Sequence, residues 1–253
     1  LFDIRMGTTD MGKICGTCGQ TNIKCPGHFG HIELARPVYY FQYINMVHKI
    51  LKCVCFRCSK LLINKEDIQN QNIFKKPSKV RWEEIRKESQ KIQRCGQFNS
   101  NGCGCLQPKY KVDGMDGIKA SWDKIISSDG SVESVEQYLK VEQVKDILEK
   151  ITDEDCRYLG YSELWCRPEW MICSVLPVPP PAVRPSVKQD DSQRMEDDLT
   201  HKLSDIIKCN NTLKQKIDSE ASMDIINDWT KVLQYHCATL IDNELPGVAQ
   251  ACH

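Results

Sequence analysis

The sequence predicts an α+β fold that is mostly helical, with short strands and two structural zinc sites. Three observations predict it: two groups of closely spaced cysteines, several segments whose apolar residues recur at helical spacing, and only short extended segments between them. A chain of 253 residues can bury a sizeable core. Its 15 cysteines are an odd number, which does not fit a fully paired disulfide framework.

The cysteines are expected to be reduced and available to metal ions. The first residues, LFDIRMGTTD, have no basic region followed by an apolar one, so they do not look like a secretory signal. No apolar run approaches the roughly 20 residues that a membrane-spanning helix needs. We therefore expect a cytosolic or nuclear protein with no membrane contact, in which closely spaced cysteines more often bind metal than form disulfides.

The charge is balanced overall but uneven along the chain. Lysine plus arginine and aspartate plus glutamate both number 34, whereas a freestanding nucleic-acid-binding protein usually has a basic excess. Residues 75–94 nevertheless carry eight basic side chains against three acidic ones. This run is either a solvated helix face or a contact for a phosphate backbone, and a salt-dependence measurement would distinguish the two.

The first cysteine group lies in CGTCGQTNIKCPGH, residues 15–28. Tetrahedral zinc takes four thiolate or imidazole ligands, and a two-residue spacing lets one tight turn present two of them to the same ion. Gly16, Gly19 and Gly27 stand where such turns are expected to need unusual backbone angles. His31 is an alternative to His28 as the histidine ligand. We predict a zinc site formed by four residues: Cys15, Cys18, Cys25 and His28.

The second group is divided between CVCFRC, residues 53–58, and CGQFNSNGCGC, residues 95–105. We predict a second zinc site whose four ligands are Cys55, Cys58, Cys95 and Cys103. Cys53 and Cys105 are alternative ligands. Neither predicted site leaves an obvious open coordination position, which favours a structural over a catalytic role.

A zinc nucleobase deaminase is the enzyme that these residues could also suggest. His31 and Glu33 form an H-x-E pattern, and a C-x-x-C pattern follows at Cys55. The match is poor because Val54 stands where those enzymes have proline, and because the first cysteine group would lose its partners. We do not favour this interpretation.

Apolar periodicity and turn residues predict the elements that surround the cysteines. HIELARPVYY is expected to be a strand, and KVDGMDGIKASW followed by SSDGS a loop or hairpin insertion. Thr152 is expected to cap a short helix that Gly160 ends. Longer helices are predicted within three ranges: 42–54, 80–93 and 141–151.

The proline-rich segment RPEWMICSVLPVPPPAVRPSV is predicted to start buried and to leave as an extended polyproline II arm, either a linker or a ligand for a proline-binding groove. Two helices follow, in DDLTHKLSDIIKCNNTLKQKI and MDIINDWTKVLQYHCATLID. Their apolar stripes are predicted to pack in the core. The first consists of Leu199, Leu203, Ile206, Ile207 and Leu213, and the second of Ile225, Ile226, Trp229, Val232, Leu233 and Leu240.

Four separated motifs resemble a known family along nearly the whole chain. They are RMGTTD, CGTCGQTNIKCPGHFGHIELARPV, the proline-rich segment above and VLQYHCATLIDNELPG. Together they are similar to the largest subunit of multisubunit DNA-dependent RNA polymerases, most like the eukaryotic RNA polymerase II type or a relative encoded by a large DNA virus. The resemblance implies the clamp, a mobile zinc-bearing region that closes over the DNA cleft and holds template DNA and the RNA–DNA hybrid.

This resemblance implies a division of the chain into four parts. Residues 1–110 would carry both zinc sites, 111–182 the clamp core helices and the proline-rich arm, 183–199 a lid-like loop, and 200–253 the C-terminal clamp helices. The eight predicted zinc ligands match the positions of two family zinc sites. In the lid-like loop, Arg184, Lys188 and Arg194 are expected to contact nucleic acid.

The resemblance also implies partners and limits. Expected partners are other polymerase subunits, especially the second-largest, together with DNA, the hybrid and transcription factors. The location would be the nucleus, or a viral factory or virion for a viral source. The acidic loop that holds catalytic Mg²⁺ in the family is expected outside this chain, so the segment is part of a nucleotidyltransferase without its catalytic residues. A freestanding zinc-dependent nucleic-acid-binding or scaffold protein is the alternative.

Several positions depart from the family pattern. Ile4 stands where the family usually has proline, and Lys140 with Val141 replaces the usual Ser-Thr helix cap. The stretch between Cys95 and Cys103 is also shorter than in polymerase II relatives.

Overall fold

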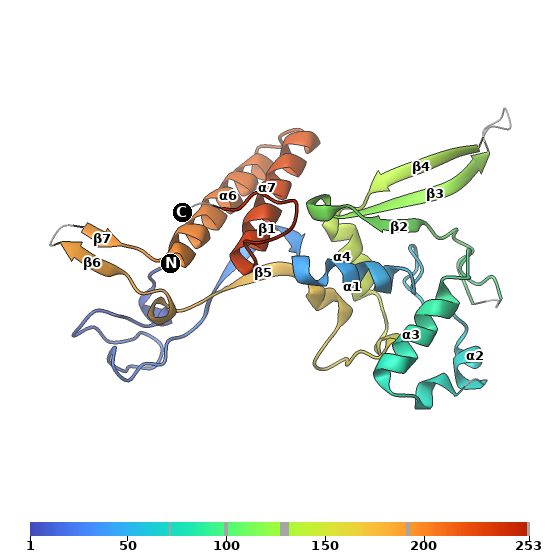
Figure 1. Ribbon diagram of the computed structural model, residues 1–253, viewed down its shortest axis with the longest axis horizontal. Helices are drawn as coiled ribbons and strands as arrows, with labels where there is room; N and C mark the ends of the chain where they lie inside the picture. Colours follow the sequence, from blue (N-terminus) through green and yellow to red (C-terminus); the bar gives the residue numbers. More distant parts are fainter. Residues whose placement is uncertain (71, 99–100, 127–131, 191–192, 252–253) are drawn as a thin grey trace. The chain divides into compact units, whose positions relative to one another are not determined.

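A computed structural model places the chain in two compact units (Figure 1). The terminal unit combines Leu1–Val38 with Cys173–His253, and the central unit is Tyr39–Ile172. This division is not the linear one expected from the resemblance, because the two ends of the chain fold together and the two predicted zinc sites fall in different units. The structure describes five ranges: 1–70, 72–98, 101–126, 132–190 and 193–251.

The terminal unit is built around a two-stranded sheet and a pair of long helices. Strand β1 pairs with β5, and β6 pairs antiparallel with β7. The elements are the 3₁₀ turn η1 (Ile4–Met6), β1 (Gly30–Tyr39), β5 (Ile172–Val178), η6 (Pro181–Val183), β6 (Val187–Asp190), β7 (Gln193–Met195), α6 (Asp198–Asp218) and α7 (Met223–Ile241). The strand predicted over HIELARPVYY is therefore confirmed.

Helices α6 and α7 lie side by side and pack on β1 (Figure 1). The buried Asn210 of α6 accepts a hydrogen bond from Ala35 N at 2.8 Å and donates one to Glu33 O at 2.9 Å. This side chain therefore satisfies two backbone groups of β1. The predicted stripes are right only in part, because three of their members are exposed: Leu199, Ile225 and Val232.

The proline-rich segment does not leave the fold as a polyproline II arm. Pro180 is extended, but Pro181–Val183 form a 3₁₀ turn, and both Pro180 and Pro181 are buried. Proline is compatible with the first position of a helical turn, since its fixed φ suits the turn and its missing N–H has no partner there to lose. The expectation of an extended arm was wrong at this turn.

The central unit contains helices and a three-stranded antiparallel sheet in the order β2-β3-β4. The β3–β4 hairpin confirms the predicted insertion, and its SSDGS turn lies outside the described residues. The elements are η2 (Phe41–Tyr43), α1 (Ile44–Leu51), α2 (Lys65–Asn70), η3 (Ile73–Lys75), α3 (Ser78–Ser89), β2 (Lys109–Val112), η4 (Gly114–Asp116), β3 (Ile118–Ile126), β4 (Val132–Tyr138), α4 (Val141–Glu149), α5 (Asp153–Leu159) and η5 (Pro168–Met171).

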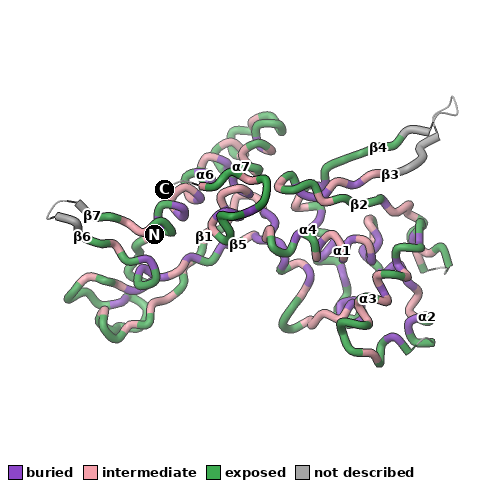
Figure 2. The backbone as a smooth tube through the Cα atoms, in the orientation of Figure 1, coloured by how far each residue is buried: buried purple, intermediate pink, exposed green. Residues whose placement is uncertain are grey.

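The core of the central unit follows the predicted helix faces (Figure 2). Ile44, Val47, Ile50 and Leu51 of α1 are all buried, as their spacing predicts. The described side chains of β4, residues 134–138, are exposed, so this edge of the sheet carries none of the core. Mixed helix and strand content, with helices the larger share, confirms the α+β class. Among the described helices, none is long and apolar enough to cross a membrane.

Candidate metal centres

The terminal unit brings the first predicted ligand group together. Cys15, Cys18, Cys25 and His28 offer ligand atoms that all lie within 4.8 Å of one another. Three of the four side chains are half-buried or buried, and Cys18 is exposed. Three thiols and one imidazole at these separations are the donor set of a structural zinc site.

A tight turn holds Cys15 and Cys18. Cys15 N donates to Gln20 O at 2.9 Å, Gly19 N donates to Cys15 O at 3.0 Å, and Thr17 N donates to Cys15 Sγ at 3.4 Å. Gly19 adopts φ +67°, a left-handed angle that closes the turn. Gly16 does not adopt a left-handed angle, so the prediction was wrong for that glycine. Backbone N–H groups therefore point at the sulfur, and the hydrogen bonds from the backbone of Cys18 and Thr17 lower the pKa of the Cys15 thiol to about 6.

The second half of this group is fixed against distant parts of the same unit. Gly27 N donates to Cys25 Sγ at 3.4 Å, and His28 N donates to Met6 O at 3.0 Å. Gly27 has φ +83°, and a Cβ atom there would lie 2.8 Å from Pro180. Glycine is thus required both by the angle and by the proline-rich segment that crosses it.

His28 supplies an independent test of the metal fit. Its Nε2 atom is buried without a hydrogen-bond partner among the described residues. Buried polar atoms are nearly always satisfied. A metal ion between this nitrogen and the three sulfurs would satisfy it, so the donor set and the orphaned atom agree.

The central unit brings the second predicted group together. Cys55, Cys58, Cys95 and Cys103 offer sulfur atoms that all lie within 4.8 Å of one another. The Sγ atoms of Cys55 and Cys103 are 3.5 Å apart, and those of Cys58 and Cys95 are 3.7 Å apart. Four sulfurs at such distances fit one tetrahedral ion.

The turn at Cys55 repeats the turn at Cys15. Cys55 N donates to Lys60 O at 2.8 Å, Ser59 N donates to Cys55 O at 2.9 Å, and Arg57 N donates to Cys55 Sγ at 3.4 Å. Ser59 has φ +58°, the angle that Gly19 supplies in the first site. Although burial opposes the change, hydrogen bonds from the backbone N–H groups of Cys58 and Arg57 lower the pKa of the Cys55 thiol to about 7.

The loop from Cys95 to Cys103 is a longer version of the same turn. Cys95 N donates to Cys105 O and Gly104 N donates to Cys95 O, both at 3.0 Å. Gly104, with φ +72°, follows Cys103 as Gly19 follows Cys18. The extra residues therefore lie between the first ligand and the closing hydrogen bonds. The sequence alone does not reveal that the two turns correspond, because the gap between Cys95 and Cys103 is longer than the gap between Cys15 and Cys18.

Gln107 is a residue of this site that the sequence interpretation missed. Its amide Nε2 donates to Cys55 Sγ at 3.4 Å and to Cys105 O at 2.8 Å, and its Oε1 accepts a hydrogen bond from Phe56 N at 2.9 Å. One side chain therefore ties the two ligand turns together. The only sequence signal is its place directly after the second cysteine group, in GCGCLQP.

The alternative ligands lie outside both groups. Cys53 is buried, its Sγ donates to Lys49 O at 3.3 Å, and burial raises the pKa of its thiol to about 12. Cys105 Sγ donates to Leu106 O at 3.5 Å. His31 is exposed and faces Glu33, with 4.0 Å between its Nε2 and the carboxylate. The two groups of candidate metal ligands thus consist of the eight residues predicted.

The three residues expected to contact nucleic acid lie in different surroundings. Arg184 has an exposed fraction of 0%. Its guanidinium donates to the carbonyls of Pro179 and Leu1 and to Thr200 Oγ1, and it stacks on Phe2. All of these partners are protein groups, so Arg184 anchors the start of the lid-like segment; its contact with nucleic acid stays a prediction.

Lys188 and Arg194 lie in a hairpin rather than a loop. They are directly opposite each other in the pairing of β6 with β7.

The basic run 75–94 is partly neutralised within the central unit, because Lys76 pairs with Glu84 at 2.6 Å and Lys91 with Glu88 at 2.7 Å. Arg81 stacks on Phe74. Much of that run is therefore a solvated helix face.

Known proteins are similar in sequence to this chain over its whole length. A family model described as RNA polymerase Rpb1, domain 1, matches residues 1–253. The DNA-directed RNA polymerase II subunit RPB1 of Euplotoides octocarinatus is 41% identical over 258 residues, which cover 99% of this chain and 53% of that protein. The DNA-directed RNA polymerase subunit Rpo1N of Methanocaldococcus jannaschii is 41% identical over 260 residues, 100% of this chain and 18% of that protein.

The chain therefore spans about half the length of the first relative and a smaller share of the second. The family match covers both units and both cysteine groups. Identity of this level over the whole chain agrees with the four motifs that the sequence carries. The chain belongs to the family of the DNA-directed RNA polymerase largest subunit, in which it corresponds to domain 1 of the Rpb1 type.

Proposed function

We propose that the chain is the clamp segment of the largest subunit of a DNA-dependent RNA polymerase, which closes over the DNA cleft and holds template DNA and the RNA–DNA hybrid. The family match over residues 1–253 is the observation that carries the proposal. The segment would work as part of a nucleotidyltransferase whose catalytic Mg²⁺ is bound outside residues 1–253. Its location would be the nucleus, or a viral factory or virion for a viral source.

Two structural zinc ions belong to the proposal, held by the eight clustered ligands. The low burial of residues 8–29 in the terminal unit supports a metal there, since Cys15 is the one buried residue among them. Such a segment cannot be held by apolar burial. Zinc binding contributes roughly 10–16 kcal/mol in small zinc peptides, enough to fix its shape.

Lys188 and Arg194 remain the proposed nucleic-acid contacts of the lid-like hairpin. Their opposed positions in β6 and β7 put two cationic residues at one level of that hairpin. Replacing either with glutamate is expected to reduce the slope of log affinity against log salt by about one for each lost phosphate contact. An unchanged slope in the assembled enzyme would remove that residue from the proposal.

Co-purification from the source organism tests the function. A tagged largest subunit that contains this chain should bring down the second-largest polymerase subunit, and elemental analysis of the chain should find two zinc ions. A chain that purifies alone and binds one DNA sequence tightly would instead be a freestanding zinc-dependent nucleic-acid-binding protein. A chain that purifies alone without binding DNA would be a scaffold protein.

A further inference from the structure

The two stretches that carry the second cysteine group have charges of one sign only. Residues 53–63 and 90–112 contain six lysines and arginines and no aspartate or glutamate. All six of these cationic residues are exposed. A zinc ion with four thiolate ligands keeps a formal charge of about −2, which offsets only part of this excess. The surroundings of the second metal centre are therefore positively charged even when the metal is bound.

Three of these cations converge on one loop, residues 101–105. Lys60 Nζ and Arg94 Nη1 each donate to a backbone carbonyl of this loop, at 3.2 and 3.4 Å. Burial raises the pKa of the Cys105 thiol and the positive charge of Arg57 opposes that rise, which puts Arg57 beside the same loop. We call Arg57, Lys60 and Arg94 the basic surface.

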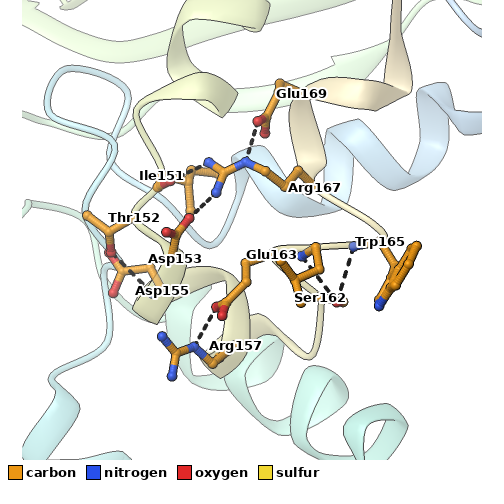
Figure 3. A network of polar contacts seen from close by, with 11 residues as sticks. Ile151, Thr152, Asp153, Asp155, Arg157, Ser162, Glu163, Trp165, Arg167 and Glu169 are labelled. Carbon is orange, nitrogen blue, oxygen red and sulfur yellow. Dashed lines mark hydrogen bonds and ion pairs between the residues drawn. The ribbon is translucent and has the colours of Figure 1, made fainter.

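No carboxylate of the described residues forms an ion pair with any of the three cations of the basic surface. Other arginines of the central unit are matched by such groups. Arg157 pairs with Glu163 at 2.7 Å, and Arg167 pairs with Asp153 and with Glu169 (Figure 3). The unmatched charge is therefore a property of the basic surface and not of the central unit in general.

Helix α3 does not carry the same excess, because it has charges of both signs. Its sequence contains four basic residues and three acidic ones. Two of the acidic residues, Glu84 and Glu88, neutralise the lysines at either end of the helix, Lys76 and Lys91. The charge of α3 is thus nearly balanced, whereas the stretches around the second cysteine group have no acidic residue to balance theirs.

The loop beside the basic surface leaves room for a chain-like anion. Gly104 has φ +72°, and no atom lies within 4 Å of a Cβ atom added there, so its backbone faces open space. Phosphate oxygens take donors from arginine, lysine and the backbone, and a small residue lets a phosphate come close. A polyanion is therefore the complementary partner, and the proposed function places one polyanion, nucleic acid, in the same assembly.

We infer that Arg57, Lys60 and Arg94 form a contact for the sugar–phosphate backbone of nucleic acid. Such a contact does not depend on the base sequence, and it weakens as salt rises because binding releases counterions. It is separate from the contact proposed for Lys188 and Arg194, which lie in the terminal unit. The inference rests on the proposed function, which supplies the nucleic acid.

The salt dependence of binding in the assembled enzyme tests this contact. The probe is a fluorescent scaffold of template DNA, non-template DNA and RNA. Arg57→Gln, Lys60→Gln and Arg94→Gln should each reduce the slope of log affinity against log salt by about one, and the triple variant by about three. Arg157→Gln is the matched control, because it removes the same charge from the same unit but Glu163 already neutralises that charge. Its slope should equal that of the wild type.

Zinc content and charge-conserving variants separate a lost contact from a damaged fold. Lys60 and Arg94 also hold the loop 101–105, so elemental analysis should find two zinc ions in each variant. The Arg57 side chain makes no hydrogen bond to the described residues, so Arg57→Gln tests the contact even if the other two variants lose zinc. Arg57→Lys should keep the wild-type slope. Shortening the upstream duplex, the downstream duplex and the RNA in turn identifies the strand, since only one of them should lower the wild-type slope without lowering that of the triple variant.

An unchanged slope in Arg57→Gln would overturn the inference, as would an equal reduction in Arg157→Gln. A basic surface that binds an acidic protein segment instead would show itself by loss of a subunit from the triple variant at an unchanged slope. If the second-largest subunit co-purifies while the slopes stay unchanged, the basic surface is wrong and the proposed function stands. If the second-largest subunit does not co-purify at all, both are wrong.

Discussion

Gly27 lies in the turn that joins the last two ligands of the first site, with φ +83° and Pro180 against it. Gly27→Ala is expected to lower the free energy of unfolding by about 2–4 kcal/mol, because it adds backbone strain to a steric overlap. Gly19→Ala is the matched control. It has a similar angle, φ +67°, but nothing lies within 4 Å of its added Cβ, so about 1 kcal/mol of strain is expected.

Urea denaturation at a fixed free zinc concentration measures both variants. Fixing the metal matters because zinc that binds the folded chain shifts its apparent stability. Equal losses for the two variants would contradict the close packing of Pro180 on Gly27.

Gln107 is expected to set how tightly the second site holds its ion. Gln107→Leu removes the donor to Cys55 Sγ and leaves Phe56 N without its acceptor. Residues that orient metal ligands typically account for 10–100-fold in affinity, and a loss of about that size is expected here. Competition with a chelator of known affinity measures it. Gln97→Leu, in the same loop but hydrogen-bonded to Gln93 N, should leave the affinity unchanged.

The ligand residues could be predicted from spacing, whereas their supports could not. A two-residue gap between cysteines has a direct geometric meaning, so Cys15 with Cys18 and Cys55 with Cys58 were found. The role of Gln107 depends on a contact across 52 residues, which no local pattern encodes. The expectation that Arg184 contacts nucleic acid comes from the resemblance of residues 183–199 to a lid, whereas its burial depends on the distant Thr200 and Phe2.

Helix α5 depends on its first hydrogen bond. Thr152 Oγ1 accepts from Asp155 N at 3.2 Å, and the helix ends at Gly160 with φ +87°. Thr152→Ala is expected to lower the free energy of unfolding by about 1 kcal/mol, since Asp155 N then lacks its acceptor. Thermal or urea unfolding of the zinc-loaded chain measures the change, and Thr152→Ser should restore most of it. A full loss in the serine variant would contradict the cap.

Features that depend on nearby residues could be predicted from the sequence, whereas features that depend on distant residues could not. The faces of α1 and the cap of α5 follow from apolar spacing and from side chains within four residues. The turn at Pro181 and the exposure of Ile225 have causes outside their own segments. Proline permits both an extended arm and a first helical turn, so the proline-rich sequence alone could not distinguish them.

At the scale of the whole molecule, the two units do not follow the order of the sequence, because one of them combines both ends of the chain. The terminal unit forms because β1 pairs with β5 and because Asn210 bonds to the backbone of β1. These contacts join residues more than 130 positions apart, so a linear division of the chain could not anticipate them. Within this division, all four residues of each cysteine group lie in one unit.

Loss of one zinc ion should therefore disturb only the unit that binds it. Chelation is expected to release two zinc ions per chain and to unfold the turn-rich segments around both groups, because metal binding supplies folding free energy there. Cys18→Ser should leave one zinc ion and expose residues 8–29 to hydrogen exchange, and Cys58→Ser should leave the other ion and expose residues 53–62 and 93–107. Cys166→Ser, an exposed cysteine outside both groups, should keep both ions. Loss of both ions in either ligand variant, or full retention of thermal stability after chelation, would mean that the metal does not fix the shape of these units.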